Sequence, residues 1–246
     1  MIRLIRRQYI FLFVLTGWML LFPGCKKDPE IPVSGKFIDS RDQHEYQWVI
    51  IGTQTWMSEN LAWLPAVSPP LADSDTAKYY YVFRYEGSSV TEAKAWEYYA
   101  DFGVFYNWPA AMNGCDSSHA IPSGVRGICP EGWHLPSDGE WDILVNYLGG
   151  QYTAGIEMKS SSGWNEYNGE SGDGDNSSGF NGLAAGSRHN DGGFYNLGFN
   201  AIFWSSTGCG DNSAWYRYLG YFQKGVYRYI SNKRYGFSVR CVKDIE

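Results

Sequence analysis

The sequence predicts an α+β domain of antiparallel sheets, few helices and long irregular loops. Residues 45–51 place Tyr46, Trp48 and Ile50 at every second position, which is the periodicity of a strand. One strong amphipathic helix pattern follows Pro136. The 246 residues include 29 Gly, 19 Tyr and 11 Trp, a composition that suits loops and an aromatic core.

The N-terminus has the three parts of a signal peptide. Three arginines within the first seven residues precede an uncharged run at residues 10–22, which is shorter than the roughly 20 residues of a transmembrane helix. The Gly24-Cys25 junction resembles a bacterial lipobox, although Phe22 stands where that motif usually has Leu. The resemblance implies cleavage after residue 24 and acylation of Cys25. An ordinary secretory signal and an uncleaved membrane anchor are the alternatives.

The charge of the mature chain restricts its partners. Removing residues 1–24 removes three arginines and no acid, which leaves 17 Lys and Arg, 26 Asp and Glu, and a net charge of −9. This balance argues against nucleic acid and against electrostatic attachment to anionic lipid. We therefore expect membrane contact only through the N-terminal lipid.

Residues 25–36 predict a flexible tether, because the stretch that starts at Lys26 is polar, contains two prolines and shows no periodicity. Its Cys-Lys-Lys-Asp start resembles the signals that send Bacteroidetes lipoproteins to the cell surface. The expected location is the outer membrane or the cell surface, outside the cytoplasm.

The cysteines predict disulfides. If Cys25 is acylated, four remain in an oxidising compartment, and four cysteines allow three pairings. We favour Cys115–Cys129, which closes a short loop, together with Cys209–Cys241. Four free thiols are the alternative.

The first elements are a hairpin and a loop. Gly52 and Thr53 supply a two-residue turn after the strand at 45–51, and residues 54–57 return as its partner. Residues 64–76 are rich in Pro, Ser and Asp and predict a loop.

An aromatic run and two short helices follow. Residues 79–85 suggest a strand, and residues 91–100 suggest a short helix. Residues 107–112 offer Asn107 as an N-cap with Pro109 in the first turn, which also favours a short helix.

The clearest helix begins after Ser137. Ser137 and Glu140 form the S-x-x-E pattern of a capping box, and Gly149 with Gly150 ends the helix. Its apolar face is predicted to pack on a sheet and consists of Trp141, Leu144, Val145 and Leu148.

The final third alternates polar loops with aromatic strands. From Gly163 the chain is rich in Gly, Asn, Ser and Asp. Phe237, Val239 and Cys241 share one face of the predicted closing strand. Strands are predicted at residues 201–205, 215–222, 226–230 and 237–242, with a turn at 223–225.

Seven segments, in this order and spacing, resemble the Fibrobacter succinogenes major paralogous domain. The resemblance implies one domain over residues 37–244 in a secreted or lipid-anchored protein, and it implies no established biochemical activity. The segments are 51–61 (IGTQTWMSENL), 106–112 (YNWPAAM), 129–141 (CPEGWHLPSDGEW), 179–183 (GFNGL), 203–207 (FWSST), 214–218 (AWYRY) and 235–241 (YGFSVRC).

A looser resemblance concerns the fold. The Cys-Pro-x-Gly-Trp segment at Cys129 and the final Gly-Phe-x-x-Arg-Cys segment look like the first and last strands of C-type lectin-like domains. Residues 132–141 also resemble a segment of formylglycine-generating enzymes. These resemblances imply that the N- and C-terminal strands pair in one sheet, with a helix behind them and a long irregular excursion between.

No catalytic set is visible in the sequence. The four histidines form no H-E-x-x-H motif, and no G-x-S-x-G motif occurs. His134 lies between Trp133 and Leu135, so we interpret it as a hydrogen-bonded structural residue. The reactive cysteine pair of formylglycine-generating enzymes would fall within residues 213–233, which contain no Cys. We therefore expect no enzyme.

Asp173, Asp175 and Asn176 form a candidate Ca²⁺ loop, because alternate oxygen ligands in a Gly-rich loop suit this ion. The EF-hand position eleven residues after Asp173 is Ala184 instead of Glu, and a solvated turn is the alternative.

The predicted hairpin at 215–230 is the candidate ligand site. Trp215, Arg217 and Leu219 fall on one face, with Tyr221 in the same alternation, whereas Tyr216, Tyr218 and Phe222 fall on the other. Both faces are aromatic, so one can fill the core while the other stacks on a sugar or contacts a protein. Candidate ligand-binding residues are Arg188, Asp191, Trp215, Tyr218, Arg228 and Tyr229.

These observations favour a lipid-anchored, non-catalytic surface binding or adhesion module with a glycan or protein ligand. A structural component of the cell envelope or of a surface assembly is the first alternative. A secreted enzyme of unknown reaction is the second.

Overall fold

The computed structural model describes residues 33–245. The predicted signal peptide, Cys25 and most of the predicted tether lie outside the described residues. Within 33–245, no helix is long and apolar enough to cross a membrane.

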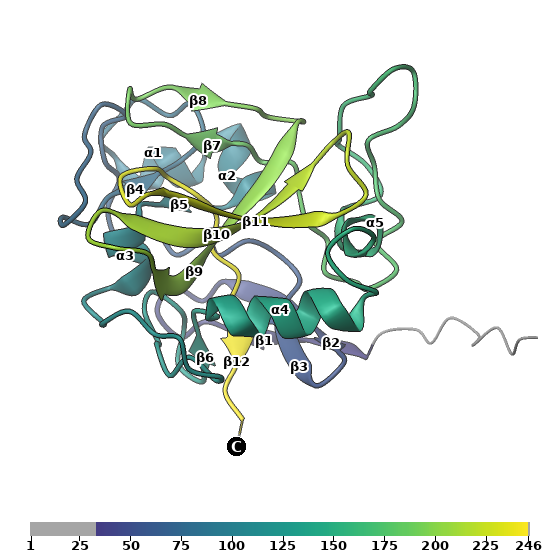
Figure 1. The fold of residues 1–246 in the computed structure, drawn as a ribbon. Helices are drawn as coiled ribbons and strands as arrows, with labels where there is room; N and C mark the ends of the chain where they lie inside the picture. Colours follow the sequence, from purple (N-terminus) through teal and green to yellow (C-terminus); the bar gives the residue numbers. More distant parts are fainter. Residues whose placement is uncertain (1–32, 246) are drawn as a thin grey trace, which may run out of the picture. The chain divides into compact units, whose positions relative to one another are not determined.

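The first sheet contains both ends of the described chain. Its strands are antiparallel, and the order is β1-β2-β3-β12-β6 (Figure 1). The last strand thus lies between β3 and β6 and makes no pair with β1. The bounds are β1 (Ser34–Ile38), β2 (Glu45–Ile51), β3 (Gln54–Met57), β6 (Trp133–His134) and β12 (Val242–Lys243).

The tether is shorter than predicted. β1 begins at Ser34, and Lys36 pairs with Gln47 instead of belonging to a flexible segment. Phe37 stacks on Trp133 with ring centroids 4.6 Å apart, which fixes this strand on the sheet. This packing could not be predicted from local sequence, because Trp133 lies 96 positions after Phe37.

The predicted hairpin is confirmed, with Gly52 in the turn at a φ of +60°. The buried face of β2 differs from the expected one. Tyr46 is buried, but Ile50 is exposed, whereas Val49 and Ile51 are buried. The strand changes its buried face because Tyr46 packs in one core cluster, and Val49 and Ile51 pack in another.

The second sheet has the order β11-β10-β9 and is also antiparallel. Its strands are β9 (Asn200–Gly208), β10 (Ser213–Gly220) and β11 (Val226–Asn232). Two small ribbons accompany it: β4 (Tyr80–Tyr81) with β5 (Phe105–Tyr106), and β7 (Ser187–Arg188) with β8 (Phe194–Tyr195).

The helices are short except for one. The helix predicted at 91–100 is two helices, because Trp96 is extended and its indole N–H donates to the Phe83 carbonyl at 3.1 Å. Asn107 caps the helix that follows it, as predicted. The bounds are α1 (Val90–Lys94), α2 (Glu97–Phe102), α3 (Trp108–Met112), α4 (Asp138–Tyr147) and α5 (Ala154–Met158).

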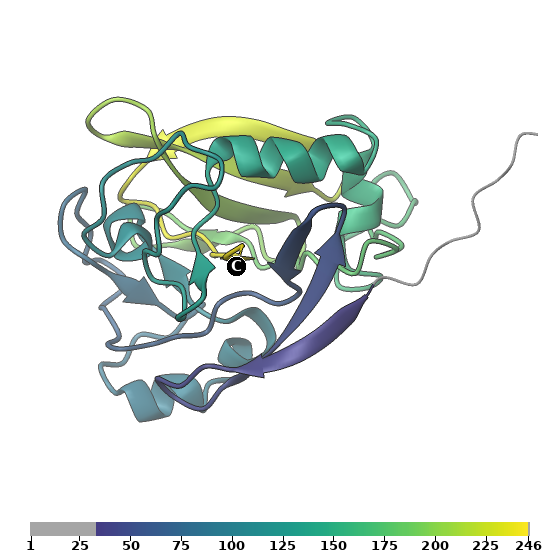
Figure 2. The ribbon, with the colours of Figure 1, turned by 90° about the horizontal axis from the view of Figure 1, so that it is seen from below.

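Helix α4 packs between the two sheets (Figures 1 and 2). Its capping box between Ser137 and Glu140 is present, and its four predicted apolar residues are buried. Trp141 lies 4.6 Å from Trp56 of β3 and 5.6 Å from Phe203 of β9, measured between ring centroids. This helix therefore joins both sheets through one aromatic contact chain.

The disulfide joins Cys129 to Cys241, whereas Cys115 and Cys209 are free. The favoured pairings Cys115–Cys129 and Cys209–Cys241 were therefore wrong. The pairing of β12 with β6 brings Cys241 to the segment just before β6, across 112 residues of sequence. Spacing along the chain cannot reveal such a contact. Cys115 is exposed while Cys129 is buried.

Replacing both Cys129 and Cys241 by Ala is expected to lower the free energy of unfolding by about 2–5 kcal/mol, because the bond closes a long loop in the unfolded chain. Urea denaturation measures the loss. The matched control replaces Cys115 and Cys209 by Ala and is expected to shift stability by less than about 0.5 kcal/mol. Equal stability of the two double variants would contradict the assignment.

Candidate functional site

Four tyrosines gather on one face of the second sheet. Alternation along β10 places Tyr216 and Tyr218 on the same side, and alternation along β11 does the same for Tyr227 and Tyr229. The register sets Tyr216 opposite Tyr229 and Tyr218 opposite Tyr227. We call these four residues the tyrosine face.

The rings of the tyrosine face contact one another. Tyr229 lies 6.0 Å from both Tyr216 and Tyr218 and 6.3 Å from Tyr227, measured between ring centroids. Tyr229 is 45% exposed, and the other three are half-buried. The group thus forms an aromatic surface that solvent reaches.

The tyrosine face continues a buried aromatic layer. On β9, Trp204 pairs with Tyr216 and is fully buried against Phe237, at 4.3 Å between ring centroids. Exposure rises from β9 toward β11 because the chain around Ser238 bonds to the outer side of β9, whereas β11 pairs only with β10. The inner rings hold the outer ones in place.

A second row of rings extends this surface. Tyr235 lies 5.9 Å from Phe237 and 4.9 Å from His189, and His189 lies 4.7 Å from Tyr195. Burial lowers the pKa of His189, so its ring is neutral at pH 7. A series of neighbouring aromatic rings therefore runs from β11, through the buried Phe237, to the β7–β8 ribbon.

Asp191 lies on this ribbon, as the sequence predicted for a polar loop. The Gly193 N–H donates to its Oδ1 at 2.9 Å, and the Tyr195 hydroxyl donates to its Oδ2 at 2.8 Å. These bonds, first that of Gly193, lower the pKa of Asp191. The carboxylate is therefore a fixed acceptor beside an exposed ring.

Arg188 does not belong to the ligand surface, which corrects the prediction. Its side chain is fully buried over the Tyr81 ring, 4.4 Å from the centroid. It donates to the carbonyls of Pro70, Ala72 and Arg234. These contacts fasten the 70–72 loop to β7, and the predicted loop from residue 64 to 76 supplies them from a distant part of the sequence.

Trp215 and Arg228 lie on the opposite face of the sheet, so they cannot share a ligand with Tyr218 and Tyr229. The Arg228 guanidinium sits 3.3 Å from the centroid of the Trp215 ring, and its Nε donates to Asp138 at 2.6 Å. Arg217, on the same face, is buried and donates to Asp138 and to Asp142. This face holds helix α4 and is occupied by these contacts.

The side chains of the three candidate Ca²⁺ residues accept hydrogen bonds from nearby groups of the protein. Asp173 accepts from the Trp164 N–H at 3.0 Å and from the Ser171 hydroxyl at 2.8 Å. Asp175 accepts from Ser177, and Asn176 accepts from Asn181. Across residues 33–245, no group of three or more His, Cys, Asp and Glu side chains is arranged to hold a metal. Ca²⁺ binding stays a prediction.

His134 is held between two carboxylates. Its Nε2 lies 2.7 Å from Glu140, and its Nδ1 lies 2.7 Å from Asp244. Glu140 also accepts from the backbone N–H groups of Ser137 and Ser123. His134 is only 3% exposed, and both ring nitrogens are engaged, so the geometry fits a structural residue.

The charge state of His134 makes stability depend on pH. Burial lowers its pKa, but the bonds to Glu140 and Asp244 outweigh this effect and raise the pKa above 6.5. The pKa of His134 is higher in the folded protein than in the unfolded chain, so protonated His134 stabilises the fold. This stabilisation is complete at a pH below the pKa of the unfolded chain, and it is lost as the pH rises through the pKa of the folded protein. We expect the free energy of unfolding to fall more steeply between pH 6 and 9 in the native protein than in His134→Gln.

Urea denaturation at a series of pH values measures this difference in slope. At pH 6 the substitution itself is expected to cost about 1–3 kcal/mol, because it removes the charged partner of the buried Glu140 carboxylate. Parallel pH profiles for the two proteins would show that His134 is not charged in the folded state.

Comparison with known proteins gives one match. The model of the Fibrobacter succinogenes major domain matches residues 49–243. The chain belongs to this family. No curated protein and no solved structure matches it. The family assignment agrees with the seven segments seen in the sequence, and the matched region contains the whole tyrosine face.

Sequence reasoning found part of this site. Tyr218, Tyr229 and Asp191 are exposed or half-buried on the connected aromatic surface. Tyr216 and Tyr227 were missed as site residues, although strict alternation along the hairpin would have selected them with Tyr218 and Tyr229. No local sequence pattern places Tyr235 and His189 beside the tyrosine face, because only tertiary packing brings them together.

Proposed function

We propose that this family member is a lipid-anchored, non-catalytic surface module that binds a glycan on the tyrosine face. The observation that carries the proposal is the cluster of four tyrosines at the edge of the second sheet, in which the Tyr229 ring lies next to the other three. Sugar rings present C–H faces that stack on aromatic rings, and tyrosine hydroxyls bond sugar hydroxyls. The buried layer beneath keeps this surface preorganised, which lowers the entropic cost of binding.

The charge and the sequence motifs support the surface role. An acidic mature chain with a lipobox-like Cys25 fits anchoring by acyl chains at the outer membrane or cell surface. The α+β architecture, in which a helix packs on a sheet that contains the first and last described strands, supports a C-type lectin-like fold.

A structural role in a surface assembly is the second candidate. β11 is an edge strand of seven residues, and three consecutive residues from Arg228 to Ile230 are exposed. An unpaired edge of this kind can accept a strand from a partner. A donated strand would add backbone hydrogen bonds along β11, whereas a glycan would need the tyrosine rings.

The test is binding of the purified protein to a panel of polysaccharides, by glycan array and by pull-down on insoluble material. Tyr229→Ala and Tyr218→Ala are each expected to weaken binding about tenfold, since a tenfold change corresponds to 1.4 kcal/mol and one aromatic contact supplies a term of that size. Repeating the panel with a chelator tests the Ca²⁺ prediction.

Tyr147→Ala is the matched control, because Tyr147 is 59% exposed and is the last residue of α4, which packs on the other side of the second sheet from the tyrosine face. This variant is expected to bind like the native protein. Absence of binding across the panel, or equal binding by all variants, would refute the glycan site. Mass spectrometry that finds an unmodified N-terminus would refute the anchor separately.

A further inference from the structure

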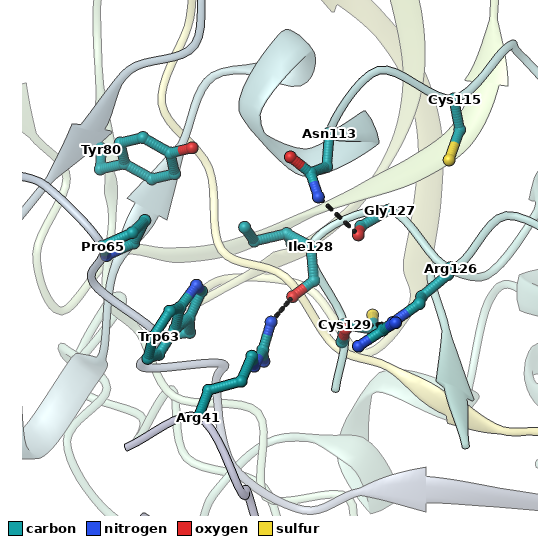
Figure 3. A pocket seen from close by; sticks show the side chains of 10 residues that line it. All are labelled: Arg41, Trp63, Pro65, Tyr80, Asn113, Cys115, Arg126, Gly127, Ile128 and Cys129. Atoms are coloured by element: carbon teal, nitrogen blue, oxygen red, sulfur yellow. Dashed lines mark hydrogen bonds between the residues drawn. The ribbon is translucent and has the colours of Figure 1, made fainter. Parts of the chain in front are cut away.

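A separate pocket of about 400 Å³ lies between the 63–65 segment, β4 and the 113–129 segment (Figure 3). We call it the Trp63 pocket. Its lining includes Trp63 and Tyr80 on one side and Asn113, Cys115 and Arg126 on the other. The volume suits one monosaccharide or a similar small molecule. None of these residues belongs to the tyrosine face.

The cationic groups of the Trp63 pocket are not all neutralised. Arg41 is paired with Asp39 at 2.6 Å, lies 4.7 Å from the Trp63 ring centroid and donates to the Ile128 carbonyl. Arg126 makes only one weak bond to protein within the described residues, from Nε to the Cys129 carbonyl at 3.4 Å. Its two terminal nitrogens are therefore available to an acceptor.

Two further donors line the pocket without a protein partner. Among the described residues, neither the Tyr80 hydroxyl nor the Trp63 indole N–H donates to a protein acceptor. Figure 3 shows the Tyr80 hydroxyl directed into the pocket. Burial raises the pKa of Tyr80, so the hydroxyl keeps its proton at neutral pH. The Tyr80 side chain is mostly buried, but its hydroxyl is not among the buried polar atoms without a partner, so solvent reaches it and it can donate to a bound acceptor.

The lining contains no carboxylate. The Asp39 carboxylate pairs with the lining residue Arg41, whose guanidinium is held by three bonds to Asp39 and one to Ile128. Lys78 adds a positive charge at the rim through its bond to Asn113 at 2.6 Å. The pocket is thus locally cationic and rich in donors on an acidic chain.

We propose that the Trp63 pocket binds the carboxylate of a small acidic sugar. The Arg126 guanidinium would form a bidentate pair of hydrogen bonds with the carboxylate, because both the guanidinium and the carboxylate are planar. The Tyr80 hydroxyl and the Trp63 N–H would donate to the remaining sugar oxygens. This site shares no residue with the tyrosine face, so the two binding proposals can be refuted separately.

Isothermal titration of the purified full chain with galacturonate tests the proposal, with galacturonate methyl ester as the matched neutral ligand. We expect binding of galacturonate, and at least tenfold weaker binding of the ester. Arg126→Gln is expected to abolish the preference for the acid. Arg126 is exposed, so this substitution leaves the fold intact.

Tyr80→Phe and Trp63→Phe each remove one donor and keep an aromatic ring, and each is expected to weaken galacturonate binding about three- to tenfold. Tyr229→Ala is the control and is expected to leave this binding unchanged. No binding of galacturonate, equal binding of acid and ester, or full binding by Arg126→Gln would overturn the proposal.

Cys115 reports where the ligand binds, because its thiol is exposed at the pocket. In a Cys209→Ser background under reducing conditions, alkylation of Cys115 by iodoacetamide is expected to slow when galacturonate is added and to be unaffected by the ester. Unchanged alkylation at saturating galacturonate would place the ligand elsewhere and refute the assignment to this pocket.

Discussion

The structure depends on one segment near the C-terminus, residues 236–244, which bonds to almost every part of the fold. Gly236 exchanges hydrogen bonds with Arg188 of β7, and Phe237 exchanges them with Tyr106 of β5. Further along, the segment bonds β9 through Ser238, the 61 region through Val239 and β3 through Cys241. It then forms β12 between β3 and β6, with the disulfide to Cys129 beside it. Neither sheet is complete without this segment.

Arg240 strengthens this arrangement from inside the core. Its side chain is fully buried, and it donates to Asn60 and to the carbonyls of Met57, Phe180 and Asn181. The cation also faces the rings of Phe180 and Phe203. Burial lowers the pKa of Arg240 to about 9, yet the surrounding carbonyl dipoles and rings accommodate the charge. One side chain thereby connects β3, the 180–181 loop and β9 on the side of the second sheet that α4 covers.

The sequence predicted the features that local signals encode. The capping box and apolar stripe of α4, the hairpin at Gly52 and the two faces of β10 follow from residues a few positions apart. Features set by distant contacts escaped prediction. The Cys129–Cys241 pairing, the burial of Arg188 under the 70–72 carbonyls and the donors around Trp63 depend on segments that meet only in the folded chain. The candidate ligand set mixed both faces of β10, because composition shows that both faces are aromatic and does not show which one α4 covers.

The position of the 236–244 segment also affects how the chain acquires its structure. Five elements, β3, β5, β6, β7 and β9, lack these hydrogen-bond partners until residues 236–243 have been synthesised. Contacts between such distant positions form slowly, because a long loop must close before any of them is gained. A product that stops short of residue 236 keeps its strand edges open and is exposed to proteases.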